Sequence, residues 1–513
     1  MIPHALIRLL SRFRNHQVAT RLSLVVLAAL TMQLWLATAS ADEKKTQDED
    51  SWQVIYIGKD RVGYARTVQR ETEVDGQTLI VMNSESHMTL KRFGQTIRFI
   101  QVLQTTETKD GDWLSFVSEM RNPPAKPNRT VGTIKDNKLT LEETINGRTS
   151  KRTIDWSRDL KAPGYQDRML MDPPIKPGET RKFRTFETQF KQPTDIKVKA
   201  DDYRNVKNHE GKNIKALKLA MTQSILPQMT VTVYMDEKGN SIKTETPFLG
   251  TSLVTFTVPK EVALEEIAGS ELDLAVGTLI EVPRIENAHS RKKVVYRVIT
   301  PDEDATKYLV TGESQKVRKV SEEVAEVTVI SLRPDANPRN VKTDDEFLES
   351  SRFLQSKDSE VVRHADRAAG GEVNATKIAL KMEKYVRDKI TEKNFSTAMA
   401  SAGEVARSLE GDCTEHACLL AAMLRAKRIP SRVAVGMVYV DRLSKFGGHM
   451  WTEAYLGGKW IPLDATLGKG GIGAGHIKLA QSSFSDDEPS PMTTFVPLIN
   501  ILGKMKIEVV SVE

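Results

Sequence analysis

The feature that most constrains the fold is a change of hydrophobic period about two thirds of the way along the chain. Up to about residue 258, apolar and polar residues alternate, as in Met229–Met235, a pattern that gives a strand one apolar and one polar face. From about Asp344 the spacing becomes helical, with Ile378, Met382 and Tyr385 on one face. The chain is therefore predicted to be α+β, with antiparallel β-rich domains preceding a mixed C-terminal domain.

Turn-forming pairs and short apolar runs divide the N-terminal part into strands. Pairs typical of tight turns are Asp75-Gly76, Asp110-Gly111, Asn146-Gly147 and Lys238-Gly239. The predicted strands are Val54–Ile57, Thr78–Met82, Thr96–Leu103, Leu114–Val117, Met229–Met235 and Leu253–Val258. Acidic residues are scattered here as on solvated strand edges, so we predict no catalytic group in this part.

At 513 residues the chain is too long for one hydrophobic core, and several domains are expected. We assign residues 1–41 to a targeting segment, 42–51 to a polar linker, 52–259 to a β-rich domain, 260–343 to a bridge and 344–513 to the C-terminal domain. The bridge is predicted to hold a short helix at Val262–Ile267 and strands at Val294–Ile299 and Val327–Ile330. Asn374 is placed to cap a helix at the start of the last domain.

The first 41 residues have the pattern of an export signal. Four arginines precede an apolar run at 22–37, and Ala39-Ser40-Ala41 supplies the small residues that a signal peptidase reads. The apolar run is shorter than the roughly 20 residues of a stable transmembrane helix. We therefore expect an exported protein, periplasmic or extracellular, with an uncleaved membrane anchor at 22–37 as the alternative.

The net charge of +6 comes mostly from this segment. Residues 1–41 contain four Arg and no acidic residue, so the remainder carries 70 basic and 68 acidic residues. No cluster of basic residues interleaved with aromatics stands out in that remainder. Nucleic acid is therefore not expected as a partner, and a hydrophobic content of 39% is typical of a globular protein.

The chain has two cysteines, Cys413 and Cys418. Five residues apart on one helix, they would be separated by an axial rise of roughly 7.5 Å. That rise exceeds the Cα separation of about 7 Å that a disulfide allows. At least one free thiol is thus expected in a compartment that tends to oxidise thiols, which suggests that the thiol has a use.

Cys413 is predicted to lie in the first turn of a helix. Gly411 and Asp412 are breaker and cap residues, and strong helix formers follow them. Cys413 shares a core-facing stripe with Ala417 and Leu420. The N-terminus of a helix carries unpaired N–H groups and partial positive charge, which favour a thiolate. The same N–H groups could stabilise an oxyanion.

Other residues of this helix have competing interpretations. His416 could be a rival base or a solvated helix residue. Cys413, His416 and Cys418 could suggest a metal site, but no further ligand pair at zinc spacing follows, and we predict neither a metal nor a cofactor. Cys418 lies about 140° round the helix from Cys413 and is expected to pack in the core.

Downstream, the sequence predicts a β-hairpin around a Gly457-Gly458 turn. With a two-residue turn, Asp464 lies opposite Trp451 and diagonal to His449 on the same face. Diagonal neighbours are about 7–8 Å apart at the backbone, which allows an imidazole–carboxylate hydrogen bond. The hairpin thus predicts a base with an orienting carboxylate. Glu453 shares this face and could replace Asp464, and Trp451 is expected to wall the cleft.

Three blocks of sequence resemble the bacterial transglutaminase-like family over roughly residues 345–513. They are GDCTEHA at 411–417, HMWTE at 449–453 and WIPLDAT at 460–466, with Arg425–Arg432 between the first two. The glycine usual before Ile-Pro in the family is Arg428 here, a departure at a turn. The resemblance implies a papain-like fold, in which the helix bearing the cysteine packs on an antiparallel sheet that carries the histidine and the aspartate.

By this resemblance Cys413 is the nucleophile, His449 the general base and then acid, and Asp464 the residue that orients His449. The resemblance identifies no side chain that completes the oxyanion hole. Three residues are candidates by position only: Asn394, Ser396 and Thr397.

The resemblance implies a thiol enzyme that forms an acyl-enzyme from a peptide or protein amide, with water or an amine as acceptor. Hydrolysis and amine transfer share every named residue, so the sequence does not separate them. The alternative is an exported binding or scaffold protein with an inactive domain, because the β-rich part and the bridge together occupy more than half of the chain. A third hypothesis is that this part binds lipid or cell-wall material for the enzyme.

Overall fold

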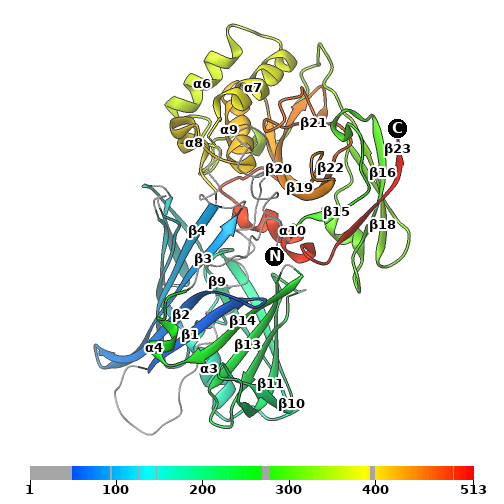
Figure 1. Ribbon diagram of the computed structural model, residues 1–513. Helices are drawn as coiled ribbons and strands as arrows, with labels where there is room; N and C mark the ends of the chain where they lie inside the picture. The colour runs from blue at the N-terminus through cyan, green and yellow to red at the C-terminus, as the bar shows by residue number, and fades with distance from the viewer. Residues whose placement is uncertain are drawn as a thin grey trace.

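The computed structural model describes residues 49–513, apart from 93–94, 124–126, 146, 228, 249, 268–277, 393–398 and 489. The expected targeting segment, most of the polar linker and the candidates Asn394, Ser396 and Thr397 lie outside the described residues. Among the helices that are described, none is long and apolar enough to cross a membrane. The α+β class is confirmed: strands fill the N-terminal part, and a mixed domain follows (Figure 1).

The N-terminal part is one antiparallel sheet of 14 strands, in the order β8-β7-β6-β5-β4-β3-β2-β1-β14-β13-β12-β11-β10-β9. The first half comprises β1 (Glu49–Ile57), β2 (Asp60–Val74), β3 (Gln77–Arg92), β4 (Gln95–Thr108), β5 (Trp113–Arg121), β6 (Asn128–Lys135), β7 (Lys138–Ile145) and β8 (Arg148–Asp155). The second half comprises β9 (Thr180–Glu187), β10 (Gln192–Lys207), β11 (Asn213–Gln223), β12 (Val231–Met235), β13 (Ser241–Phe248) and β14 (Thr251–Val258).

The alternating pattern explains why these segments are strands. In β12, Val231, Val233 and Met235 are buried while the residues between them are half-buried, as expected for a strand with one apolar face. Five of the six predicted strands lie wholly within observed ones, and the sixth begins two residues early, at Met229. The five strands that contain the other predictions are longer than predicted, because pairing with neighbours extends them beyond their most apolar residues.

The two end strands of this sheet, β8 and β9, are consecutive in the chain. The connection holds α3 (Pro163–Met171) and runs beside β9, where the Lys161 N–H donates to the Arg184 carbonyl at 2.7 Å. On α3, Arg168 pairs with the buried Glu107 of β4 at 3.6 Å. The helix therefore packs against the sheet through a charged pair as well as apolar contacts.

The bridge leads to a four-stranded sheet in the order β17-β18-β16-β23. The segment from residue 260 to the start of the C-terminal domain holds α4 (Lys260–Ala263), β15 (Ile280–Glu281), η1 (Ala288–Ser290), β16 (Lys293–Ile299), η2 (Ala305–Tyr308), β17 (Gln315–Lys319) and β18 (Val324–Ile330), and η3 (Asp345–Phe347) follows. The two predicted strands are confirmed within β16 and β18, while the predicted helix is shorter and begins earlier, as α4. The last strand, β23 (Lys506–Val512), pairs with β16, so the C-terminus returns to this sheet (Figure 1).

The C-terminal domain places four helices beside a third antiparallel sheet, which has five strands. The helices are α6 (Ser359–Ala369), α7 (Ala375–Lys389), α8 (Ala402–Ser408) and α9 (Cys413–Ala426). The sheet and the segment after it comprise β19 (Ser431–Val440), β20 (Lys445–Leu456), β21 (Lys459–Leu463), β22 (His476–Ser482), η4 (Pro491–Phe495) and α10 (Val496–Ile501). The strand order is β15-β20-β19-β22, and β21 pairs with β20. As predicted, Asn374 caps α7, accepting from the Lys377 N–H at 3.0 Å.

Candidate active site

Cys413 begins α9, and Asp412 caps that helix. The Asp412 carboxylate accepts from the Thr414 N–H at 2.8 Å, and a reciprocal capping box joins Asp412 to Glu415. The side chains from Cys413 to Arg425 are all buried, so α9 is surrounded by packed structure and not only along one stripe. Thr452 of β20 donates to the Ala417 carbonyl at 3.0 Å, which fixes α9 against the sheet.

The first turn of α9 has fewer free N–H groups than a bare helix end. The cap already binds the N–H groups of Thr414 and Glu415. No described residue accepts a hydrogen bond from the N–H of Cys413. In the described part of the chain, this N–H is the group of the first turn best placed to contact an oxyanion formed at the thiol.

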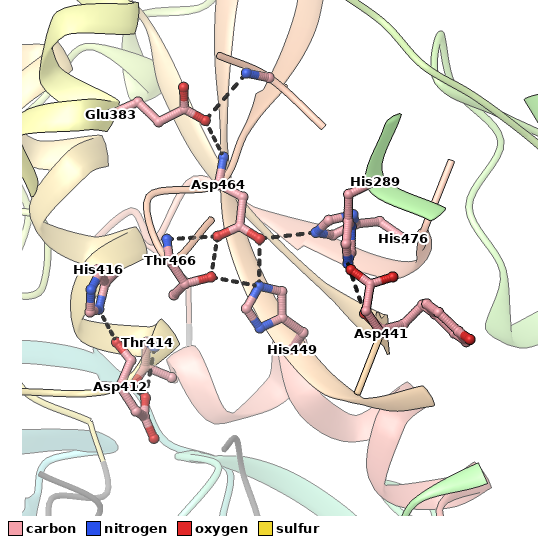
Figure 2. Close-up of polar contacts among 12 residues, drawn as sticks. His289, Glu383, Asp412, Thr414, His416, Asp441, His449, Asp464, Thr466 and His476 are labelled. Carbon is pink, nitrogen blue, oxygen red and sulfur yellow. Dashed lines mark hydrogen bonds and ion pairs between the residues drawn. The ribbon is translucent and has the colours of Figure 1, made fainter. Parts of the chain in front are cut away.

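The predicted hairpin places His449 beside Asp464. The register Thr452↔Leu463 continues the pairing that puts Asp464 opposite Trp451. His449 lies in β20, and Asp464 directly follows β21. The Nε2–H of His449 donates to Oδ2 of Asp464 at 2.8 Å (Figure 2). The two side chains therefore meet diagonally across the hairpin, in the manner expected from the turn chemistry.

Asp464 is held by further donors that the sequence did not suggest. Its Oδ1 accepts from the Thr466 N–H at 2.8 Å and from the Thr466 hydroxyl (Figure 2). Its own backbone N–H donates to Glu383 of α7 at 2.9 Å. Glu383 also accepts from the Gly471 N–H at 3.3 Å, and burial raises the pKa of this carboxyl to about 7. The aspartate is thus fixed through both its side chain and its backbone.

A second histidine binds the same carboxylate. His476, the first residue of β22, donates from Nε2 to Oδ2 of Asp464 at 3.0 Å. Trp451 packs against both imidazoles, with ring centroids 6.3 Å from His449 and 5.2 Å from His476. His289 lies beyond His476 at 5.4 Å between rings. Oδ2 of Asp464 therefore lies between two imidazole N–H donors.

The charges in the site favour an ionised His449 and an ionised Asp464. Burial opposes ionisation of His449, but the charges of Asp464 and then Cys413 outweigh it and raise its pKa to about 10. Burial likewise opposes ionisation of Asp464, yet His449 and His476 hold the pKa of this carboxyl well below its usual range. Burial lowers the pKa of His476 to about 4, so its ring is neutral at pH 7. The site therefore resembles an imidazolium–carboxylate pair with a neutral histidine beside it.

The second ring nitrogen of His449 is available for the thiol. Its Nδ1 has no partner within the usual hydrogen-bond distance and angle among the described residues, but the Cys413 side chain is near enough to raise the pKa of this ring by its charge and by hydrogen bonding. The exposed fractions are 4% for Cys413, 4% for His449 and 1% for Asp464. All three residues are thus almost completely buried in this conformation.

His416 and Glu453, the alternatives to His449 and Asp464 in the sequence, both bind other groups. His416 is buried rather than solvated, and its Nδ1–H donates to the Asp412 carbonyl at 2.6 Å, so this nitrogen is not a free base. Glu453 binds Arg432 at 2.7 Å and Lys478 at 2.9 Å. These ion pairs occupy the carboxylate that could have replaced Asp464.

Neither cysteine forms a disulfide in the described part of the chain, and both are buried. Cys418 is completely buried, which confirms that it packs in the core. The predicted absence of a disulfide between Cys413 and Cys418 is also confirmed.

Three potential metal-ligand atoms, from His449, Asp464 and His476, lie within 4.8 Å of one another. They already bind one another through two N–H···O hydrogen bonds of 2.8 and 3.0 Å. These bonds account for the cluster without an ion.

Among the residues that the sequence missed, only Thr466 carried a local signal. An Asp followed two residues later by Thr is a common side-chain-to-backbone turn. His476 and Glu383 lie 12 and 81 residues from Asp464 along the chain. Their approach depends on the packing of β22 and α7, which no local pattern specifies.

Residues 363–465 match the transglutaminase-like superfamily. The matched segment contains all three residues of the predicted triad, from the helices α6–α9 to the aspartate after β21. The family resemblance of the C-terminal third is therefore confirmed: it contains a transglutaminase-like domain. No curated protein matches the chain.

Three solved structures are similar to parts of the chain. A candidate cysteine protease from Cytophaga hutchinsonii has 19% identity and a TM-score of 0.28, with 44% of this chain and 87% of that chain covered. A β-barrel-like protein of unknown function from Brucella abortus has 12% identity and a TM-score of 0.29, with 40% and 95% covered. The periplasmic domain of TgpA from Pseudomonas aeruginosa has 14% identity and a TM-score of 0.25, with 36% and 77% covered.

Proposed function

We propose that the transglutaminase-like domain is a cysteine-nucleophile enzyme that acts on peptide or protein amides through Cys413, His449 and Asp464. The observation that carries this proposal is the 2.8 Å bond between His449 and Asp464, with Nδ1 of the same ring free for the thiol. The family match covers the same residues. The proposal further holds that the protein is exported by its N-terminal segment.

In the first half of the reaction the thiolate of Cys413 attacks the amide carbonyl carbon. The N–H of Cys413 stabilises the oxyanion. His449 gives its Nδ1 proton to the leaving amine as the C–N bond breaks, which leaves a thioester on Cys413 and a neutral imidazole. Asp464 holds the other nitrogen throughout, so that the ring keeps its orientation.

In the second half water or an amine attacks the thioester. The neutral His449 takes the proton of the acceptor, the C–S bond breaks, and the thiolate–imidazolium pair is restored. Water as acceptor makes the enzyme a protease or amidase, and an amine makes it an acyltransferase. The same three residues serve both outcomes.

The alternative is an inactive binding or scaffold protein, and the burial of the site favours it. With 4% or less of each of the three residues exposed, little of the thiol and the imidazole is accessible to a substrate in this conformation. An enzyme would open to admit its substrate, whereas a scaffold would stay closed.

Alkylation of the two thiols separates the alternatives. Iodoacetamide near pH 7 is expected to modify Cys413 roughly tenfold faster than Cys418, measured peptide by peptide by mass spectrometry, because Cys413 interacts with His449 whereas Cys418 is completely buried. Equal slow rates would favour the scaffold. Capture of exported proteins with an activity probe, compared between wild type and Cys413→Ala, then identifies substrates. Turnover of a captured substrate unchanged by Cys413→Ala would refute the assignment of the nucleophile.

The export proposal has its own test. The N-terminus of the protein recovered from the exported fraction is expected to be Asp42, because the small residues at 39–41 suit a signal peptidase. Recovery of the uncleaved chain in the membrane fraction would support the anchor instead.

A further inference from the structure

His449 and His476 reach Asp464 from strands that are not neighbours. Strand β19 lies between β20 and β22 in the sheet. In β19, Gly436 pairs with His449 and Val438 pairs with His476. Residues two apart in one strand point to the same face, so both histidines lie on the face shared by Gly436 and Val438.

A β-bulge is responsible for placing His476 on that face. The pairing of β19 with β22 runs Val435↔Ala480 and then Gly436↔Lys478, which leaves Leu479 as the extra residue. Without the bulge Val438 would pair with Ile477. A slip of one residue moves every later side chain to the opposite face, and His476 would then point away from Asp464.

Gly436 makes the bulge possible. A Cβ added there would lie 2.0 Å from the carbonyl oxygen of Ile477, a backbone atom that cannot move aside on its own. The glycine therefore allows β22 to approach closely at the bulge. The position of the second histidine follows from this one residue together with the extra Leu479.

His476 lies in a closed environment. Its side chain is fully buried, and its Nδ1 has no hydrogen-bond partner in the described part of the chain. The charged or titratable groups around it are His449 and Asp464 on the hairpin and His289 on η1.

Further charged groups surround His289 and Asp464, the direct neighbours of His476. His289 binds the Tyr439 carbonyl at 2.8 Å and lies 4.0 Å from Asp441. Lys469 acts on the ionisation of His289 from a greater distance, and Glu383 of α7 holds the backbone of Asp464. The Asp464 contact is the hydrogen bond of His476 that connects it to the triad.

We propose that His476 is a positioning residue that acts through Asp464 and not on the substrate. This inference rests on the proposed function. Oδ1 of Asp464 is fixed by two donors from Thr466, so rotation of the carboxylate is controlled by what binds Oδ2. Two imidazoles share Oδ2, and His476 keeps this oxygen in line with Nε2 of His449. Nδ1 of His449 is then presented to Cys413.

If His476 competed with His449 for Asp464 and did not align it, its removal would have the opposite effect on His449. A histidine that merely competed for Oδ2 would weaken the bond to His449, and its removal would strengthen that bond. A positioning histidine stabilises the aligned carboxylate, and its removal would let Asp464 turn away. Because the charge of Asp464 raises the pKa of His449, misalignment would lower this pKa.

The experiment follows alkylation of Cys413 by iodoacetate between pH 6 and 11, with Cys418 as the internal reference. Iodoacetate is an anion, so its reaction depends on the imidazolium of His449 and falls when that group loses its proton. In His476→Leu the alkylation rate at pH 7 is expected to fall about tenfold. The alkaline limb of the rate profile, where the rate falls as His449 loses its proton, is expected to move down by about one pH unit. In His476→Gln, whose amide can donate to Oδ2, both are expected to stay near wild type.

His476→Asn serves as a third variant, because its amide is too short to reach Oδ2 and it should behave like His476→Leu. Thermal unfolding of each variant separates loss of fold from loss of alignment. The inference would be overturned if folded His476→Leu had the wild-type alkylation rate and alkaline limb, or higher values of either. So would equal losses in His476→Gln and His476→Leu. If wild-type Cys413 were no faster than Cys418, the proposed function itself would fail instead.

Discussion

The carboxylate of Asp464 accepts hydrogen bonds from His449, His476 and Thr466 although it lies in the interior. An isolated buried carboxylate would take up a proton, because charge is costly in a medium of low dielectric. The donors around Asp464 reverse this tendency, and its charge in turn favours the imidazolium of His449. Asp464 is therefore the largest favourable influence on the protonation of His449.

Asp464→Asn is expected to slow alkylation of Cys413 by iodoacetate at pH 7 roughly 100-fold. The amide has no charge, so the pKa of His449 should fall from about 10, while burial continues to disfavour the imidazolium. The alkaline limb of the rate profile should move down accordingly. Asp366→Asn, at an exposed pair with Lys427, is the matched control and should leave the profile unchanged. An unchanged profile in Asp464→Asn would contradict the assigned role.

Two elements, α9 and the β20–β21 hairpin, bring the predicted triad together, and a third element, β22, adds His476. The hairpin turn has positive φ at Gly457 and Gly458, of 63° and 82°, which suits the twist of the paired strands. The hairpin register follows from this turn. The register of β22 instead follows from a bulge that needs Gly436.

Gly436→Ala is expected to destabilise the domain by about 1–3 kcal/mol, because the new methyl group would force β19 and β22 apart. Alkylation of Cys413 should also slow, since His476 would lose its place beside Asp464. Thermal unfolding and the iodoacetate rate measure the two effects. Gly312→Ala is the control, because a Cβ there meets nothing nearer than the Lys478 ammonium at 3.6 Å. Wild-type stability in Gly436→Ala would show that the bulge tolerates a side chain.

On the scale of the whole molecule, a buried charge cluster joins the 14-stranded sheet to the C-terminal domain. Glu143 of β7 pairs with Lys191 and Arg352, and with Arg152 at 3.4 Å. Arg352 lies just before α6, so the carboxylate connects the two parts of the chain. Burial and then the charge of the neighbouring Arg352 lower the pKa of Lys191 to about 7.

Removing Glu143 would leave these cations buried without their shared counter-charge. Glu143→Ala is therefore expected to lower the free energy of unfolding by about 3–5 kcal/mol. Glu142→Ala, at the adjacent exposed position of β7, should change it little. Chemical denaturation measures both variants. A loss in Glu143→Ala no larger than in Glu142→Ala would mean that the cluster does not stabilise the interface.

The pH dependence of stability has a predictable sign in the strand-rich part. Burial raises the pKa of Glu107 to about 7, despite Arg168. The folded state therefore holds this proton at pH values where the unfolded state, with a pKa near 4.5, has lost it. The contribution of Glu107 to stability is present below pH 4.5 and is lost as the pH rises through 7.

Ionisation of Glu107 is expected to lower the free energy of unfolding by about 1.4 kcal/mol for each pH unit between pH 4.5 and 7. Denaturation of wild type between pH 5 and 8 should show it, and Glu107→Gln, which cannot ionise, should show a flatter profile. Parallel profiles for the two proteins would contradict the raised pKa.

The sequence by itself determined the local parts of the active site. The cap at Asp412 begins α9 at Cys413, and the Gly457-Gly458 turn sets the register that joins His449 to Asp464. Both are short-range effects, in which a few neighbouring residues fix the backbone. The α+β class followed in the same way from the change of hydrophobic period.

Only the tertiary structure decided what surrounds those parts. The order of 14 strands, the return of β23 to β16 and the contacts of Glu383 and His476 with Asp464 depend on pairings between distant segments. Alternation shows which face of a strand is apolar, but it does not name the partner strand or reveal a bulge. The pairing of His449 with Asp464 was therefore visible in the sequence, and the second histidine was not.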